Sequence, residues 1–472
     1  MTLPRLPTGI AGVDEILHGG LVKAGVYLVR GAPGAGKTIL ANQICFHHIS
    51  TGGKAAYVTL LAESHARMLE NLAEFSFYRA DAIPASVYYV SAFAALKDRG
   101  LAGVTELLAA EIRARKVKLL ILDGLVTASE AAGSAQELKL FVSELQVYSS
   151  LMGCTILLLN SVSAHDHVSP EQTMVDGILR LRHELVGSRH ERTFEVVKFR
   201  GSATIGGSHA MQISADGITV FPRLEAARTA EVEQLPGDAP LSAGVPGFDS
   251  LSHAGGYPAA SVTAVAGASG SGKTLLGLHF VGQATSQEPA LLFGFYESPA
   301  VLAKIAASFG LDLEALCKQH SLEIIWQPYG LLGLDELAYR LLRAVERTHC
   351  KRLFIDGLGG FLSARAFEER GTSFLAALSN ELRRLGTTTL VAVESDDPQG
   401  LAVPLASHGI SAMADNVVRL RIQEQAGLAR RLISMGKVQG SRLDLSLREL
   451  TLSDAGLLVA PDDRGAADAR EG

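Results

Sequence analysis

The chain contains the same pattern twice, and this duplication constrains its fold more than any other feature. Residues 6–64 and residues 241–298 each run through an opening with Gly and Asp, a glycine-rich loop and a strand-like segment that ends in Glu. Four matched features, the opening, the loop, the Glu and a later Asp, recur at a nearly constant offset of about 235 residues, which is far too long for a solenoid repeat. The 472 residues therefore predict two related domains, in line with the usual size of a domain.

The boundaries of the two domains follow from composition. We expect the first domain to span residues 1–224 and the second to span residues 241–460. Between them, residues 225–240 are polar, rich in Ala and Glu, and carry two prolines, as linkers do. Residues 461–472 are charged and rich in Gly and Ala, so we expect a disordered tail.

Within each copy, short apolar segments alternate with helix-like patterns. The segments YLVRG, AAYVTLL and KLLILDGL of the first copy are rich in Val, Ile and Leu and lack polar alternation. Parallel strands that are buried on both faces have this character. Each copy is therefore predicted to be a doubly wound α/β domain with a mostly parallel sheet. Residues 192–201 and 211–222 alternate more between polar and apolar, and predict an antiparallel extension.

Both copies carry the phosphate-binding pattern G-x-x-x-x-G-K-[ST]. In both, the pattern follows an apolar strand-like segment and opens a helix-like one, which is the context that this motif needs. Glycines let the backbone N–H groups of the loop surround phosphate oxygens, and the helix N-terminus adds positive potential. The residues predicted to bind the nucleotide are Gly31, Gly34, Gly36, Lys37 and Thr38 in the first loop, and Gly267, Gly270, Gly272, Lys273 and Thr274 in the second.

A magnesium site is predicted beside each loop, so ATP and Mg²⁺ are the expected cofactors. Thr38 and Thr274 supply the hydroxyl groups that ligate the metal in this motif. The strand-like segments KLLILD and KRLFID end in Asp123 and Asp356. An ionised Asp that ends a buried strand needs a partner, and a metal ion or its waters can serve. Capping of the next helix is the alternative role for these two carboxylates.

Hydrolysis of a nucleotide needs a group that positions the attacking water. Glu63 and Glu297 follow matched strand-like segments, and each stands just before a helix-like pattern. We predict a catalytic role for both. The alternative is a Glu in a first helical turn, where the helix dipole favours a negative charge.

Composition excludes several other classes of protein. The net charge of −6 provides no overall basic footprint for nucleic acid or an anionic membrane. The four cysteines form no C-x-x-C pair, so we expect reduced thiols and no zinc site. The apolar segments are far shorter than a membrane span, and the N-terminus lacks the pattern of a signal peptide. We therefore expect a cytoplasmic protein without a membrane partner.

The order of phosphate loop, strand-end Glu, strand-end Asp and K-x-R-G segment resembles the RecA-type ATPases. More closely, the chain resembles the KaiC family of circadian-clock ATPases and autokinases, over roughly residues 5–460. The opening TGIAGVDEILHGGL and the segment RTFEVVKFRGS, followed by ISADGITVFP, are specific parts of this resemblance. It implies a homo-oligomer, a hexameric double ring with ATP at the subunit interfaces. Signalling partner proteins follow from the family alone, since no feature of this sequence indicates them.

The resemblance also implies cations that act between subunits. In that family a Lys and an Arg of the neighbouring subunit contact the phosphates, and the matching residues here are Lys198 and Arg200. A solvated strand edge is the alternative interpretation of these two residues. In the second copy Lys437 is kept, but Gln439 replaces the arginine and cannot supply its charge.

Two further departures from the family bear on the activity. The family has paired glutamates where residues 62–63 read Ala-Glu and residues 296–297 read Tyr-Glu, so each copy lacks one carboxylate. The family's neighbouring Ser and Thr phosphorylation sites match Ser411 and Ala412, so only a single site remains. Autophosphorylation of Ser411 is one hypothesis, and a helix N-cap or loop hydroxyl is the other.

Three functions are open at this point: a KaiC-like regulatory ATPase with or without autokinase activity, a RecA-type DNA-dependent recombination ATPase, and a nucleotide-gated scaffold with little turnover. A DNA motor would need basic loops after the strands that end in Asp. The loop after Asp123 has no basic residue, and Arg365 and Arg370 in the second loop are offset by two neighbouring glutamates. The sequence therefore argues against a nucleic-acid partner and favours the KaiC-like ATPase.

Overall fold

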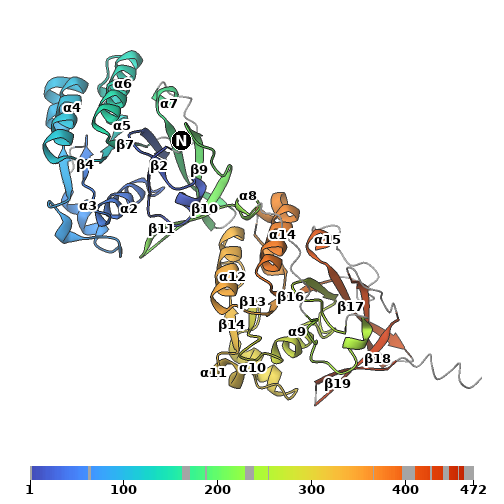
Figure 1. Ribbon diagram of the computed structural model, residues 1–472. Coiled ribbons are helices and arrows are strands. Elements are labelled where there is room, and N and C mark those ends of the chain that lie inside the picture. Colours follow the sequence, from blue (N-terminus) through green and yellow to red (C-terminus); the bar gives the residue numbers. More distant parts are fainter. Residues whose placement is uncertain are drawn as a thin grey trace, which may run out of the picture. The chain divides into compact units, whose positions relative to one another are not determined.

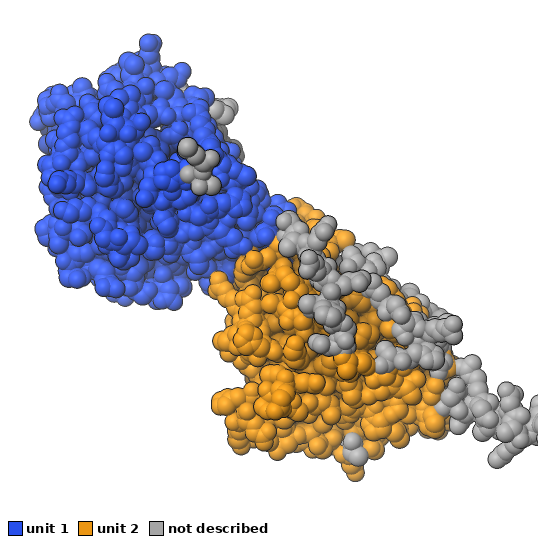
Figure 2. All heavy atoms as spheres, viewed as in Figure 1, with its two compact units in different colours: residues 1–227 blue, residues 228–472 orange. Residues whose placement is uncertain are grey.

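The computed structural model describes residues 3–61, 65–161, 171–186, 189–228, 239–252, 255–364, 366–395, 410–425, 428–438, 446–454 and 456–461. The chain divides into two compact units, residues 1–227 and residues 228–472 (Figure 2). Most of the predicted linker and the predicted tail lie outside the described residues. The predicted linker begins inside a short helix, α8 (Leu224–Ala227). The domain boundaries stay a prediction.

The main sheet of the first unit has nine strands among the described residues. They are β3 (Val26–Gly31), β4 (Ala55–Thr59), β5 (Val87–Ser91), β6 (Leu119–Asp123), β7 (Thr155–Ser161), β8 (Gly177–Val186), β9 (Arg189–Phe199), β10 (Ser208–Ser214) and β11 (Gly217–Phe221). Their order in the sheet is β11-β10-β9-β8-β3-β7-β6-β4-β5. The strands from β8 to β5 in this order run parallel, whereas β9, β10 and β11 add an antiparallel extension. A separate pair of short strands is formed by β1 (Arg5–Leu6) and β2 (Leu21–Val22).

Helices cover both faces of this sheet (Figure 1). The helical segments of this unit are α1 (Val13–Ile16), α2 (Lys37–Ser50), α3 (His65–Leu72), α4 (Phe93–Arg115), α5 (Leu125–Ala131), α6 (Ala135–Met152), α7 (Glu171–Met174) and the 3₁₀ turn η1 (Ala80–Ala82). Successive residues of a strand point to opposite faces. Tyr57 and Ile121 accordingly pack with α2 on one face, while Val58 and Leu122 pack with α4 and α6 on the other. This double burial explains why the strands are apolar throughout.

The second unit repeats the arrangement. Its strands are β12 (Val262–Gly267), β13 (Ala290–Gly294), β14 (Leu322–Trp326), β15 (Arg352–Asp356), β16 (Thr388–Glu394), β17 (Asn416–Gln425), β18 (Leu428–Lys437), β19 (Arg448–Ser453) and β20 (Gly456–Val459). The order β14-β13-β15-β16-β12-β17-β18-β19-β20 matches that of the first unit strand by strand. The helical segments are η2 (Asp249–Leu251), α9 (Lys273–Gly282), α10 (Pro299–Ala307), α11 (Leu313–Lys318), α12 (Leu334–Thr348), α13 (Gly359–Leu362), α14 (Ala366–Arg384) and α15 (Ile410–Met413). The predicted fold, two tandem RecA-like α/β domains with antiparallel extensions, is confirmed.

The parallel strands bring the predicted site residues to one edge of each sheet. In a parallel sheet all strands end on the same side, and ligands bind there. Asp123 pairs in register with Thr59, and Asp356 pairs with Gly294, so each carboxylate lies level with the end of the neighbouring strand. The loops after β3 and β12 begin at this same edge.

Helices α12 and α14 of the second unit are joined by a buried ion pair. Arg370 donates to the two carboxylate oxygens of Asp335 at 2.8 and 2.7 Å. The side chains of Arg370 and Asp335 are only 14% and 3% exposed. Arg370, considered above as a nucleic-acid contact, is therefore engaged inside the unit.

We predict that Arg370→Met lowers the free energy of unfolding of the second unit by about 3–5 kcal/mol, because Asp335 stays buried without this cation. Trp326 in β14 is the only tryptophan of the chain, so its fluorescence during urea denaturation reports on this unit. The control is Arg347→Met, which removes an exposed pair with Glu323 and should shift the urea midpoint far less. Equal shifts for the two variants would contradict the prediction.

Candidate nucleotide-binding sites

The two phosphate loops have the same local geometry. Each leaves a central strand, β3 or β12, and opens a helix, α2 or α9. The residue before each helix, Gly36 or Gly272, has a left-handed backbone with a φ angle of 103° or 107°, which favours glycine. A Cβ atom at Gly31 or Gly267 would lie 2.6 or 2.7 Å from a carbonyl oxygen of the neighbouring strand. Both loops thus need these glycines to fold as they do.

The loop lysines point back across their own loops. Lys37 Nζ donates to the carbonyl oxygens of residues 31–32 at 2.7 and 3.0 Å, and Lys273 Nζ donates to those of residues 267–268 at 2.8 Å each. Burial lowers the pKa of both ammonium groups, and nearby carboxylates act against this shift in each unit. Each ammonium therefore lies at the loop and beside acidic groups, where a phosphate would find a positive charge.

The two predicted metal-site residues of the second unit are in contact. Thr274 Oγ1 donates to Asp356 Oδ1 at 3.1 Å. Burial, and after it the charge of Glu297, raises the pKa of Asp356 to about 6. The hydrogen bond from Thr274 and the charge of Lys273 act in the opposite direction. A carboxylate in such a position is stabilised in its ionised form by a nearby cation.

The carboxylate of the first unit has a different partner. Tyr57 Oη donates to Asp123 Oδ2 at 2.7 Å. Burial raises the pKa of Asp123, while the hydrogen bond from Tyr57 and the charge of Lys37 lower it. Burial also raises the pKa of the Tyr57 phenol well above its ordinary value, and a hydrogen bond with Thr38 acts against that shift. Thr38, Tyr57 and Asp123 are thus close neighbours.

This donor set fits magnesium bound together with a nucleotide. Within the part of the chain that the structure describes, no cluster of three or more His, Cys, Asp and Glu side chains could hold a metal ion alone. Each unit instead has a loop threonine and a strand-end aspartate beside its phosphate loop. Mg²⁺ is usually held in this way, by one or two protein ligands, water and the phosphates of the substrate.

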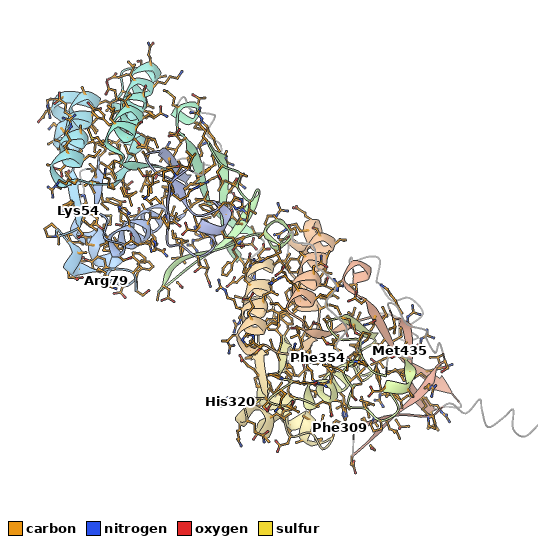
Figure 3. All side chains as sticks on the ribbon, in the orientation of Figure 1. Lys54, Arg79, Phe309, His320, Phe354 and Met435 are labelled. Carbon is orange, nitrogen blue, oxygen red and sulfur yellow. The ribbon has the colours of Figure 1, made fainter. Side chains whose placement is uncertain are left out.

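The loop of the second unit opens into a pocket of about 760 Å³, a size typical of small-ligand sites. Predicted site residues in its lining are Gly270, Gly272, Lys273, Thr274, Glu297 and Asp356. Its apolar part is lined by Ile305, Phe309, Leu452 and Leu457, and Figure 3 labels Phe309 in this unit. One pocket therefore combines charged groups suited to phosphates with an apolar wall suited to a flat base.

Sequence reasoning did not find three other residues that line this pocket. Glu394 ends β16, and its charge acts against the lowered pKa of the loop lysine. Arg431 on β18 donates from Nε to the carbonyl oxygen of Gly270 at 3.2 Å. Tyr296 stacks on Tyr329 with ring centroids 5.8 Å apart. Of these, Glu394 carried a usable pattern, since it is an acidic residue at the end of an apolar strand.

The cations predicted to act between subunits contact short helices of their own unit. Lys198 Nζ donates to carbonyl oxygens of α7 at 3.1 and 3.0 Å. Arg200 donates to carbonyl oxygens of the same helix at 3.3 and 3.5 Å. Lys437 Nζ donates to the carbonyl oxygen of Ala414, directly after α15, at 2.7 Å. None of these hydrogen bonds goes to a phosphate loop, and a role of the three cations at a neighbour's nucleotide stays a prediction.

Several residues of the sequence analysis cannot be placed. Glu63, Arg365 and Gln439 lie outside the described residues. Ser411 belongs to helix α15, and its side chain is also outside the described part. Its neighbour Ile410 lines the pocket of the second unit. Of the two predicted catalytic glutamates, only Glu297 is therefore seen at a loop.

Comparison with known proteins agrees with this geometry. A model of the KaiC ATPase family matches residues 6–225 and again residues 241–464. The chain belongs to the KaiC family. It is 27% identical over 470 residues to the circadian clock oscillator protein KaiC of Picosynechococcus sp., an alignment that covers 96% of this chain and 89% of that protein. The KaiC proteins of Prochlorococcus marinus and Synechococcus elongatus are 26% and 27% identical to it, over 97% and 96% of this chain and 92% and 88% of their own lengths. The family predicted from the motifs is confirmed.

We predict that Lys37→Ala and Lys273→Ala each reduce the ATP bound per chain from two to one. Each lysine serves its own loop, and each loop has its own carboxylate. The measurement is the amount of nucleotide retained per chain after rapid desalting with Mg²⁺. Lys54→Ala removes an exposed lysine of the first unit (Figure 3) and should leave two bound. A loop variant that still retains two molecules would show that the assignment of the sites is wrong.

Proposed function

We propose that this protein binds Mg²⁺ and ATP at both phosphate loops and hydrolyses the ATP, as a regulatory ATPase. One duplicated observation supports this most: in each unit a loop lysine lies beside a strand-end carboxylate that is buried or half-buried. Burying an ammonium or a carboxylate is unfavourable unless groups of opposite charge lie close to it. Phosphate and magnesium supply those partners, whereas a purely structural turn has no need of either group.

In the proposed reaction each group has a distinct task. The backbone N–H groups of the loop and the ammonium of Lys37 or Lys273 stabilise the charge on the transferred phosphoryl group. Asp123 with Thr38, and Asp356 with Thr274, hold Mg²⁺, which when bound neutralises phosphate charge. Glu297 orients the attacking water in the second unit, and its presence in the pocket beside the metal-site carboxylate supports this role.

We infer that Glu63 has the same task in the first unit, on the strength of its matching place in the sequence. The two units then use the same reaction but differ in their supporting groups. Arg200 stands at the place of the trans-acting cation in the first unit, where the second has Gln439. A positioned arginine is worth roughly 10³–10⁵ in rate where it has been measured.

We further propose a homo-oligomeric ring of six subunits, with ATP between neighbours and signalling proteins as its partners. The side chain of Arg200 supports such an interface, because it is 55% exposed and its hydrogen bonds of 3.3 and 3.5 Å are long. It can exchange these contacts for a neighbour's phosphate. The buried pairing of Arg370 weighs against a DNA-binding loop. Within the described residues, no helix is both long enough and apolar enough to span a membrane.

Autophosphorylation of Ser411 is the finer hypothesis for the second unit. Its support is the place of Ser411 in the chain, directly after Ile410 in the lining of the pocket. Mass spectrometry of the protein after incubation with Mg²⁺ and ATP tests it. Phosphate on Ser411 that disappears in Lys273→Ala supports the hypothesis, and an unmodified Ser411 contradicts it.

We predict that Glu63→Gln abolishes most of the steady-state phosphate release, while Glu297→Gln removes little of it. The physical reason is the residue at the place of the trans-acting cation, which is Arg200 in the first unit and Gln439 in the second. Phosphate release is followed for each variant and for the parent at saturating ATP. If Glu297→Gln silences the enzyme instead, the roles of the units are inverted. The charge must then come from another cation, such as Lys437 or Arg442, the latter outside the described residues. A parent that binds ATP but releases no phosphate would make the protein a nucleotide-gated scaffold.

We also predict that assembly requires nucleotide. Lys198 and Arg200 gain a phosphate contact only across an interface, and a ligand stabilises whichever state binds it. Light scattering with and without Mg²⁺ and ATP measures the mass of the assembly, and Arg200→Ala should shift it toward smaller species. A monomer of unchanged mass under both conditions would rule out the interface.

A further inference from the structure

Behind the metal site of the first unit lies a group of hydrogen-bonded polar side chains. Tyr57 Oη donates to Asp123 Oδ2 at 2.7 Å. Tyr89 Oη donates to Asn42 Oδ1 at 2.8 Å, and Asn42 Nδ2 donates to the carbonyl oxygen of Thr38 at 2.8 Å. The two tyrosine rings are in contact, with centroids 5.5 Å apart. The group therefore touches both residues that are proposed to hold magnesium.

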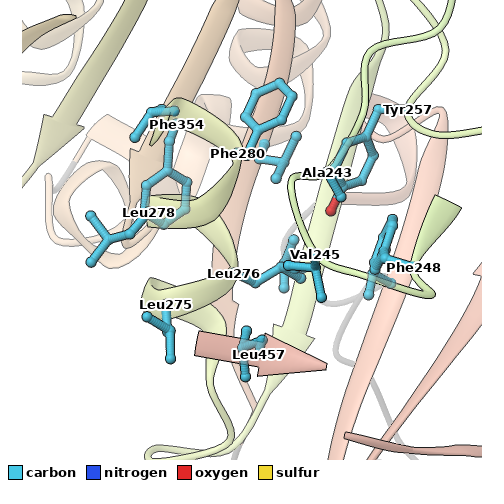
Figure 4. Close-up of a cluster of buried hydrophobic side chains, with 14 of the residues drawn as sticks. Ala243, Val245, Phe248, Tyr257, Leu275, Leu276, Leu278, Phe280, Phe354 and Leu457 are labelled. Atoms are coloured by element: carbon cyan, nitrogen blue, oxygen red, sulfur yellow. The ribbon is translucent and has the colours of Figure 1, made fainter. Parts of the chain in front are cut away.

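The second unit has apolar residues at the matching positions. Counting from the loop lysines and from the paired strands β4–β5 and β13–β14, the residues that match Asn42, Tyr57 and Tyr89 are Leu278, Leu292 and Ile324. Leu278 and Leu292 belong to an apolar cluster, against which Ile324 packs, and Figure 4 shows Leu278 next to Phe354 within it. In that unit a loop threonine, Thr274, donates a hydrogen bond to the carboxylate of Asp356.

Burying Asn42, Tyr57 and Tyr89 in the first unit costs desolvation free energy that apolar side chains would not. Tyr57 and Asn42 are fully buried, and Tyr89 is half-buried. A buried hydroxyl or amide is unfavourable unless its hydrogen bonds are made, and the second unit shows that leucine and isoleucine fit the same fold. Because each of these side chains leads to Asp123 or Thr38, their common feature is the metal site rather than packing.

We propose that Tyr57, supported by Tyr89 and Asn42, is a positioning residue for magnesium in the first unit. By donating to Oδ2, the phenol holds the Asp123 carboxylate in one orientation at the end of β6. Asn42 holds the backbone of Thr38 at the start of α2. Hydrogen-bond partners of this kind orient a metal ligand and raise the affinity of the site for the metal. The inference rests on the proposed function, because it requires Mg²⁺ and nucleotide at this loop.

The test uses Tyr57→Phe, which removes only the phenol oxygen that donates to Asp123. Tyr57→Phe is made in a Lys273→Ala background, so that only the first loop binds nucleotide. A fluorescent ATP analogue reports binding while Mg²⁺ is titrated, and the half-saturating Mg²⁺ concentration is the readout. We expect about a tenfold rise in that concentration, the lower end for loss of such a partner, with unchanged binding of the analogue in EDTA.

The matched control is Tyr27→Phe in the same background. Tyr27 is also buried in the first unit, but its hydroxyl donates to the carbonyl oxygen of Val22 at 2.9 Å, away from the metal site. This variant also loses the hydroxyl of a buried tyrosine and should keep the Mg²⁺ requirement of its parent. Thermal denaturation without ligand shows whether the two variants fold equally well.

A second variant keeps the test decisive. Asn42→Leu introduces the residue of the second unit, should raise the Mg²⁺ requirement in the same direction, and carries the test if Tyr57→Phe does not fold. Equal Mg²⁺ requirements for the Tyr57, Asn42 and Tyr27 variants would overturn the inference and leave the proposed function intact. A Lys273→Ala parent that binds no analogue at any Mg²⁺ concentration would overturn the proposed function itself.

Discussion

The placement of a lysine ammonium beside a carboxylate at the edge of a parallel sheet is the constraint on which each unit depends. Lys37 and Lys273 donate to carbonyl oxygens of their own loops, and the carboxylates whose charge acts on them stand at the ends of other strands. These groups meet only because parallel strands end on one side of the sheet. The tight loop in turn requires glycine next to the helix, at Gly36 and Gly272. Because the strand order is the same in both units, the loop and the strand-end carboxylates lie at the same edge of each sheet.

Much of this arrangement could be predicted from the sequence because it is encoded locally. The loop glycines, the lysines and the strand-end Asp residues follow from spacing along the chain, and the strands follow from segments that are apolar on both faces. Tyr57 could not be predicted, because in the sequence it is one aromatic residue among the apolar residues of β4. Only the pairing of β4 with β6 reveals that its hydroxyl reaches Asp123. The place of Arg431 in the pocket could not be predicted for the same reason, since it contacts Gly270 from a strand far along the chain.

The two units have kept the phosphate-loop residues and the strand-end Asp, and have changed the residues behind and around them. The first unit supports its carboxylate with Tyr57, whereas the second uses Thr274 against an apolar cluster. The pocket of the second unit also contains Tyr296, Glu394 and Arg431. Such a division is expected after a duplication, because contacts with a common ligand tolerate little change. The surrounding shell can diverge while the fold is retained.

Different support at two sites has a thermodynamic consequence when both sites take the same ligands. Each unit is stabilised only by what binds to it, in proportion to the logarithm of ligand concentration over dissociation constant. If the first site holds magnesium more tightly, one concentration of Mg²⁺ and ATP saturates the two units unequally. A chain with one unit loaded then becomes a populated state between the empty and the full forms. If the two sites had equal affinity, chains with one unit loaded would occur only in the proportion expected for independent binding. The polar group around Tyr57 is therefore the part of the structure best suited to separate the two loading steps in one chain.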